Sequence, residues 1–262
     1  MTRHGAGLHH REAGTGPVTL FVHGFPLDSR LWLDQIEALA DMRRCVAVDL
    51  RGFGLSPPIR SSRMTMDDHA ADLVRFLDTA GIDLVDLVGL SMGGYVALAF
   101  AERHPDRLRS LALVDTRSGP DGDDARRGRD EGIRRVLAEG RAVFVRGMVS
   151  GLLAPEAAPI AAARFLTMAE DTPYETLVAS LAGMRDRPDR TAVLETIACP
   201  VAVVVGEHDA VTPPAAAHAM AAAAGGAEVH VIAGAGHLSP IEAPDAVTSA
   251  LRGFLGQTGP GR

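Results

Sequence analysis

Short apolar runs alternate with amphipathic helical patterns along most of this chain. Runs rich in valine, leucine and isoleucine are typical of strands that are buried on both faces of a sheet. A chain that alternates strand and helix forms a mostly parallel sheet with helices on both faces. The pattern predicts strands near 18–22, 45–49, 84–89, 108–115, 200–206 and 227–234, and helices near 29–40, 65–80, 92–103, 213–224 and 242–256. We therefore expect an α/β fold whose ligands sit beyond the carboxyl ends of the strands.

The stretch 117–190 interrupts this alternation. It opens with the polar segment TRSGPDGDDARRGRDEG and continues with alanine- and arginine-rich helical patterns broken by prolines. We expect a helical cap here, inserted between a first core segment (1–116) and a second core segment (191–262). It is not expected to be a separate domain with its own function.

Composition excludes several classes of function. The formal net charge of −7 argues against a nucleic-acid partner, since phosphate binding needs a basic surface. The chain contains no lysine, which excludes Schiff-base chemistry and attachment of pyridoxal phosphate. No apolar span is long enough to cross a membrane, and no secretory signal is evident, so we expect a cytoplasmic protein without a membrane partner. Cys45 and Cys199 are expected to be reduced, unreactive thiols.

The sequence VGLSMGG lies where a predicted strand turns into a predicted helix. A Gly-x-Ser-x-Gly motif in this context is typical of a nucleophile elbow, in which a strained turn presents the serine hydroxyl at the edge of the sheet. Gly89 and Gly93 allow the strand and helix to approach closely, and the backbone N–H of Met92 points toward the same place. Ser91 is therefore the candidate nucleophile. The alternative is an ordinary turn with a serine that caps the helix.

A serine nucleophile needs a base and a group that orients the base. His237 follows the last predicted strand in the glycine-rich loop GAGHLSP, and we predict that it is the base. Asp209 follows the preceding strand, in GEHD, and is the preferred acid. Asp115, at the end of LALVD, is the rival, although we expect it to bind loop backbone instead. His9 and His10 lack partners at metal-ligand spacing, so no metal site is predicted.

In its motifs and their order the chain resembles the α/β-hydrolase superfamily. The serine–acid–histidine order is that of this fold. The matching segments are HGFPLDSRLW (23–32), VAVDLRGFGLS (46–56), VGLSMGGYVALAFAERHPDRL (88–108), VGEHDAVTPP (205–214) and IAGAGHLSPIEAPDAV (232–247). The chain looks most like the small-cap branch of carboxylesterases, 3-oxoadipate enol-lactonases and cofactor-free haloperoxidase-type perhydrolases.

The resemblance implies a mechanism for these residues. Backbone N–H groups of Phe25 and Met92 would form the oxyanion hole, and His23 would brace the loop that carries Phe25. Ser91 would attack a small carboxylic ester or lactone, the expected small-molecule partner, and form an acyl-enzyme without metal or cofactor. Perhydrolysis or C–C bond hydrolysis with the same three residues, and a non-catalytic ligand receptor, remain alternatives. Haloalkane dehalogenase and epoxide hydrolase chemistry is disfavoured, because such members carry aspartate where this chain has Ser91.

The identity of the substrate depends on the cap and is the least determined feature. Trp32, Phe144 and Met148 are the candidate substrate-binding residues, with packing inside the core as the alternative. Arginines of the cap could hold an acidic substrate, but a solvated helix face paired with nearby acidic residues is the favoured interpretation. The sequence makes no prediction about the oligomeric state.

Overall fold

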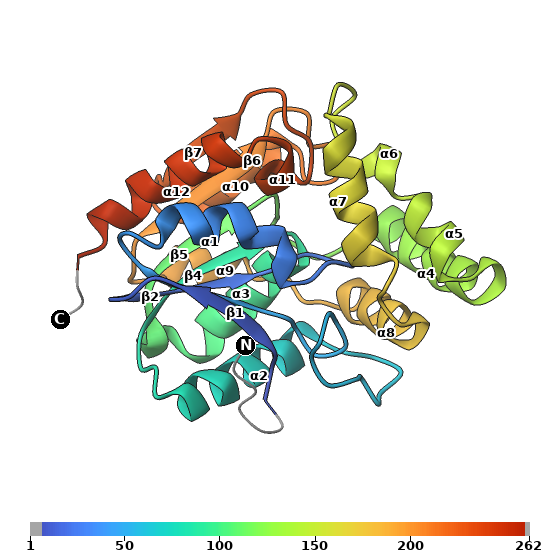
Figure 1. The fold of residues 1–262 in the computed structure, drawn as a ribbon, viewed down its shortest axis with the longest axis horizontal. Coiled ribbons are helices and arrows are strands. Elements are labelled where there is room, and N and C mark those ends of the chain that lie inside the picture. The colour runs from blue at the N-terminus through green and yellow to red at the C-terminus, as the bar shows by residue number, and fades with distance from the viewer. Residues whose placement is uncertain (1–6, 260–262) are drawn as a thin grey trace.

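One seven-stranded sheet organises the protein in a computed structural model that describes residues 7–259 (Figure 1). The strand order is β1-β3-β2-β4-β5-β6-β7, and neighbouring strands are parallel except for the antiparallel pair β1 and β3. The strands are β1 (His10–Ala13), β2 (Val18–Val22), β3 (Arg44–Val48), β4 (Val85–Leu90), β5 (Leu108–Val114), β6 (Val201–Gly206) and β7 (Glu228–Ile232). The predicted mostly parallel sheet is thus confirmed.

The central strands are buried on both faces, as their uninterrupted apolar sequences predict. Every residue of β2 and β4 is buried, and Leu20 in β2 pairs with Val46 in β3 on one side and Leu87 in β4 on the other. The edge strand β1 was not predicted. Its sequence, HREA, is polar and only half-buried, so it carries no apolar run to indicate a strand.

Two helical layers cover the sheet (Figure 1). Helices α1 (Leu33–Leu39) and α12 (Pro244–Gln257) pack together over one face. The other group is α2 (Met66–Ala80), α3 (Met92–Arg103), α9 (Thr191–Thr196) and α10 (Pro214–Ala223), in which α2 packs on α3, and α9 packs on both α3 and α10. Short 3₁₀ turns, η1 (Ser29–Trp32) and η2 (Pro105–Arg107), precede α1 and β5. No helix within residues 7–259 is long and apolar enough to cross a membrane.

The last predicted helix, at 242–256, is confirmed as α12 (Pro244–Gln257), and a short helix that was not predicted, α11 (Ser239–Glu242), comes directly before it. Each of the two begins with a proline in its first turn. Proline fits a first helical turn, where its missing N–H has no partner to lose, but it disfavours helical geometry in the residue before it. Ala243 accordingly has φ −138° and ψ 63°, which ends α11 before α12 begins.

Five helices lie between β5 and α9, and they gather at one end of the sheet (Figure 1). They are α4 (Asp123–Glu139), α5 (Arg141–Arg146), α6 (Val149–Leu152), α7 (Pro159–Ala169) and α8 (Tyr174–Arg185). Helix α4 packs on α5 and α8, while α7 packs on η1 and α11 of the core. We call α4–α8 the cap. The domain limits at 116/117 and 190/191 stay a prediction.

Candidate active site

The turn between β4 and α3 holds Ser91 in a strained conformation. Its φ of 53° and ψ of −113° lie outside the regions that non-glycine residues ordinarily adopt. A Cβ on Gly89 would lie 2.4 Å from the Gly93 carbonyl oxygen, and one on Gly93 would lie 2.3 Å from the Val22 carbonyl oxygen. Only glycine therefore permits the close approach of strand and helix that this turn requires. Ser91 itself is half-buried and its hydroxyl faces the loops at the end of the sheet.

Three loops that follow β4, β6 and β7 bring Ser91, Asp209 and His237 into one hydrogen-bonded chain. His237 Nε2 lies 2.9 Å from Ser91 Oγ, and His237 Nδ1 lies 2.8 Å from Asp209 Oδ2. His237 and Asp209 are each 3% exposed, so this pair is shielded from water. The three candidate residues thus have the geometry of a nucleophile, its base and the acid that orients the base.

Hydrogen bonds keep Asp209 ionised despite its burial. Burial alone would raise the pKa of this carboxyl, but His237 and Thr212 outweigh it and hold the pKa below its usual value. The Thr212 hydroxyl donates to Asp209 Oδ2 at 2.6 Å, and the backbone N–H groups of Val211 and Thr212 both donate to Oδ1 at 2.8 Å. Thr212 was not predicted from the sequence, although its place three residues after Asp209 is typical of a side chain that closes a turn around a carboxylate.

The rival acid, Asp115, has a different role. Its Oδ1 accepts the Gly206 N–H at 2.8 Å, and its Oδ2 accepts the Ser239 N–H at 3.1 Å and the Ser239 hydroxyl at 2.6 Å. Complete burial, together with the nearby charge of Asp209, raises the pKa of Asp115 well above its usual value. Asp115 thus binds backbone N–H groups, as expected, but these belong to the last residue of β6 and the first residue of α11 and not to a loop. It joins the end of β6 to the helix that follows the His237 loop.

Phe25 and Met92 carry the two backbone N–H groups that the sequence predicts as donors to an oxyanion. Within residues 7–259, neither Phe25 nor Met92 donates its N–H to a loop or side-chain acceptor. The loop that carries Phe25 lies directly on Ser91, because a Cβ on Gly24 would be 3.2 Å from Ser91 Cβ. His23 fixes this loop: its Nδ1–H donates to the Gly24 carbonyl at 2.9 Å, and its Nε2 accepts the Leu50 N–H at 3.0 Å.

The candidate substrate-binding residues occupy different environments. Phe144, on α5 of the cap, lies edge-on to the Phe25 ring with 6.5 Å between centroids. Trp32 is fully buried, and its ring centroid is 5.2 Å from that of Phe21 in β2, which places it in the core. Met148 is partly buried against the main apolar cluster. Phe144 is thus the member of this set that reaches the candidate oxyanion loop.

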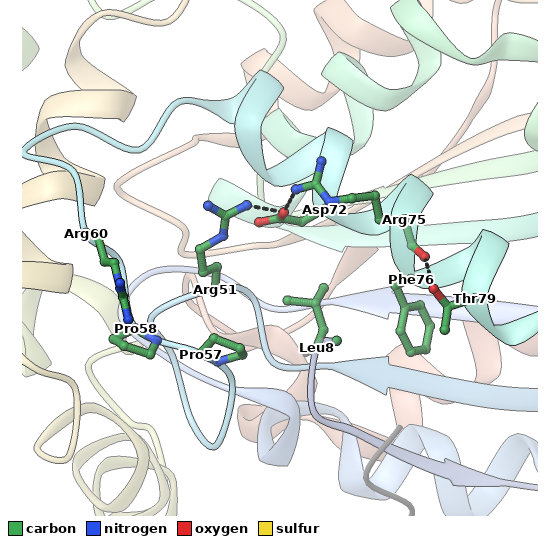
Figure 2. Close-up of a pocket in the computed structure, with 10 residues that line it drawn as sticks. Leu8, Arg51, Pro57, Pro58, Arg60, Asp72, Arg75, Phe76 and Thr79 are labelled. Atoms are coloured by element: carbon green, nitrogen blue, oxygen red, sulfur yellow. Dashed lines mark hydrogen bonds and ion pairs between the residues drawn. The ribbon is translucent and has the colours of Figure 1, made fainter. Parts of the chain in front are cut away.

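The two cysteines and the potential metal ligands in residues 7–259 do not form a second reactive site. Burial raises the pKa of the Cys45 thiol to about 12 and of the Cys199 thiol to about 11, which keeps both thiols protonated. A search of the described part of the chain finds no group of three or more histidine, cysteine or acidic side chains that could hold a metal ion. A cavity of about 660 Å³ lies between α2 and the loop after β3, where Arg51 and Arg75 both bind Asp72 (Figure 2). None of the candidate triad lines it.

Residues 17–244 match the model of the family described as the alpha/beta hydrolase fold. The chain belongs to the α/β-hydrolase family. Among solved structures, a thermophilic esterase from Thermogutta terrifontis is 40% identical, with a TM-score of 0.92 over 96% of this chain and 93% of that one. The enol-lactonase from Burkholderia xenovorans LB400 is 26% identical, with a TM-score of 0.87 over 95% of this chain and 96% of that one.

A longer relative shares the same α/β-hydrolase region. The dihydrolipoyllysine-residue acetyltransferase component of the acetoin cleaving system of Cupriavidus necator is 35% identical across 94% of this chain. The chain spans 65% of that relative's length. Family membership, together with the esterase and enol-lactonase neighbours, supports hydrolase activity for this chain. The resemblance stated from the sequence motifs is confirmed at the level of family and fold.

Proposed function

We propose that this α/β-hydrolase cleaves small, uncharged carboxylic esters through an acyl-enzyme on Ser91. The observation that carries the proposal is the hydrogen-bonded chain from Ser91 through His237 to Asp209, with the Phe25 and Met92 N–H groups beside the serine. This arrangement contains each group that acyl transfer by a serine requires.

The mechanism follows from these positions. His237 Nε2 takes the Ser91 proton as Oγ bonds to the ester carbonyl carbon, and the carbonyl oxygen becomes an oxyanion that accepts the Phe25 and Met92 N–H groups. His237 then gives its proton to the departing alkoxide, which leaves an acyl group on Ser91. Water repeats both steps and releases the acid. Asp209 stabilises the imidazolium in each half-reaction, and one oxyanion donor contributes about 3–4 kcal/mol to such a transition state.

Charge in the cap favours an uncharged substrate over an acidic lactone. Of the seven arginines on α4 and α5, five pair with acidic side chains: Arg127 with Asp124, Arg129 with Asp121, Arg134 with Glu131, Arg135 with Glu139 and Arg146 with Glu170. The cap side chains next to the loop that carries Phe25 are uncharged: Phe144 lies edge-on to the Phe25 ring, and the Thr172 hydroxyl donates to the Pro26 carbonyl. Similarity to the Thermogutta esterase supports ester hydrolysis as the reaction.

Hydrolysis of p-nitrophenyl acetate and butyrate tests the proposal, with Ser91→Ala as the variant and Ser62→Ala as the matched control. Ser62 is an exposed serine away from the triad, so its loss removes a hydroxyl without affecting the site. We expect Ser91→Ala to lower kcat by at least about a thousandfold, while Ser62→Ala keeps the parent rate. Folded Ser91→Ala protein that retains turnover would contradict the proposal.

A further inference from the structure

The backbone N–H groups of His237 and of its two neighbours are bound by groups outside the triad. The His237 N–H donates to the carbonyl of Leu152, in the cap, at 2.8 Å. On either side, the N–H groups of Gly236 and Leu238 donate to the two carboxylate oxygens of Glu242 at 3.1 and 3.0 Å. The orientation of the imidazole therefore rests on the cap and on Glu242, as well as on Asp209.

The same Glu242 carboxylate also holds the cap. Its Oε2 accepts the backbone N–H of Ala154 at 2.8 Å, two residues beyond the Leu152 carbonyl that binds His237. The two backbones are in direct contact at this point, since a Cβ on Gly236 would lie 2.5 Å from the Ala154 nitrogen. One half-buried carboxylate thus accepts three N–H groups and joins the cap to both neighbours of His237.

We infer that Glu242 is a positioning residue that couples the cap to the candidate general base. The inference rests on the proposed function, because it gives Glu242 a role only if His237 activates Ser91. His237 must keep its two ring nitrogens at 2.9 and 2.8 Å from Ser91 and Asp209 at once. Such a geometry tolerates little displacement of the backbone, and a shift of about 1 Å costs roughly a hundredfold in rate.

The hydrogen bonds of Glu242 reach well beyond its own helix. Glu242 lies at the end of the single-turn helix α11, and a purely local role would be met by its bond to Leu238, the residue that precedes this helix. The additional bonds reach Gly236 on the far side of His237 and Ala154 at a sequence separation of 88 residues. A shift of cap residues 152–154 away from the core would break the His237–Leu152 and Glu242–Ala154 bonds together.

The variant Glu242→Gln tests this role, and Glu207→Gln is its matched control. Glu207 also accepts a backbone N–H from the segment between β7 and α11, that of Gly234 at 2.9 Å, but it is exposed and does not contact the neighbours of His237 or the cap. Glutamine keeps the length of glutamate, but its NH₂ group cannot accept the N–H groups that Glu242 receives on both oxygens.

Steady-state hydrolysis of p-nitrophenyl butyrate should be measured per active site, with sites counted by a fluorophosphonate that bonds to the nucleophilic serine. We expect Glu242→Gln to lower kcat roughly ten- to hundredfold with KM changed by less than about threefold, and to slow fluorophosphonate labelling in parallel. Glu207→Gln should keep both rates within about twofold. Counting per site removes any contribution from unfolded protein.

Ala154→Pro provides a second variant that leaves Glu242 in place. Proline replaces the N–H that the cap donates with a ring carbon, which both removes the hydrogen bond and pushes against the Glu242 carboxylate. Leu153, with φ −96° and ψ 150°, already has the extended backbone that a residue before proline needs. We expect its kcat per site to fall about three- to tenfold, and the double variant with Glu242→Gln to be no slower than Glu242→Gln alone.

Three results would overturn the inference: Glu242→Gln with kcat per site within twofold of the parent, Ala154→Pro within twofold of the parent, or a rise in KM with kcat unchanged. The last result would mean that Glu242 only shapes the binding site. Failure of the proposed function is distinguishable, because the parent protein itself would then neither turn over the ester nor be labelled at Ser91.

Discussion

Two buried carboxylates at the ends of neighbouring strands have opposite pKa shifts. Asp209 is kept ionised because His237 and Thr212 donate hydrogen bonds that outweigh burial. Asp115 is fully buried and faces the charge of Asp209, so its pKa is raised well above the usual value. At the scale of single residues, the acid that orients His237 is thus distinguished by its hydrogen-bond donors and not by its place at a strand end.

This raised pKa predicts how Asp115→Asn changes stability with pH. Above about pH 4, where an unfolded aspartate releases its proton, folded Asp115 keeps its proton, so the free energy of unfolding of the parent falls as the pH rises. Asparagine does not titrate. The difference in unfolding free energy, variant minus parent, should therefore increase with pH by up to about 1.4 kcal/mol per unit until the folded pKa is passed.

Urea unfolding of both proteins at several values between pH 4 and pH 8 provides the measurement. A difference that stays flat, or that decreases as the pH rises, would show that folded Asp115 is ionised at low pH like an exposed aspartate.

The turn that presents Ser91 was predictable at the scale of elements, because its signal is local. Helix α3 begins at Met92 as expected, and Gly89 and Gly93 stand where backbone groups approach too closely for a side chain. The edge strand β1 and the short helix α11 were not predicted, since β1 lacks an apolar run and the four residues of α11 are too few to show a helical period.

Some of the site could not be read from the sequence for a different reason. Thr212 lies in the same loop as Asp209, so a local turn signal could have found it. The contact between Glu242 and Ala154 forms only when the cap folds back onto the loop after β7. Phe144 could be named as a candidate, but its approach to Phe25 likewise depends on how α5 packs over the core. Local motifs indicate the reacting groups, whereas cap contacts need the tertiary structure.

Gly93→Ala tests how closely the start of α3 packs against the end of β2. The new methyl group would meet the Val22 carbonyl oxygen at 2.3 Å, and the backbone there has no flexible neighbour that can yield. We expect a loss of about 3 kcal/mol in unfolding free energy together with loss of esterase activity. Gly253→Ala in α12 is the contrast, since nothing lies within 4 Å of its Cβ, and alanine in a helix should add about 0.5–1 kcal/mol. Equal stability of the two variants in urea unfolding would contradict this account.

At the scale of the whole molecule, side chains in two places hold the cap against the core: Arg187, just after α8, and Thr172, between α7 and α8. Arg187 is buried, donates to Asp121 at 2.7 Å and to the Gly119 carbonyl at 3.0 Å, and lies 4.0 Å from the centre of the Tyr95 ring in α3. The Thr172 hydroxyl donates to the Pro26 carbonyl at 3.0 Å, beside the candidate oxyanion loop.

The cap and the segment that follows it therefore contact three of the elements on which the proposed chemistry depends. Arg187, just after α8, meets the Ser91 helix at Tyr95, Thr172 and Phe144 meet the candidate oxyanion loop at Pro26 and Phe25, and Leu152 meets the His237 loop. A change in the cap is therefore expected to alter the reaction rate as well as the choice of substrate.

The central claim is that Ser91 is the nucleophile of a serine hydrolase, and covalent labelling tests it most directly. The folded protein is treated with a fluorophosphonate, digested and mapped by mass spectrometry, beside Ser91→Ala. The account predicts a single adduct per chain, on the peptide that contains Ser91, and none on the variant. An adduct on another residue, or a folded parent protein that stays unlabelled, would contradict it.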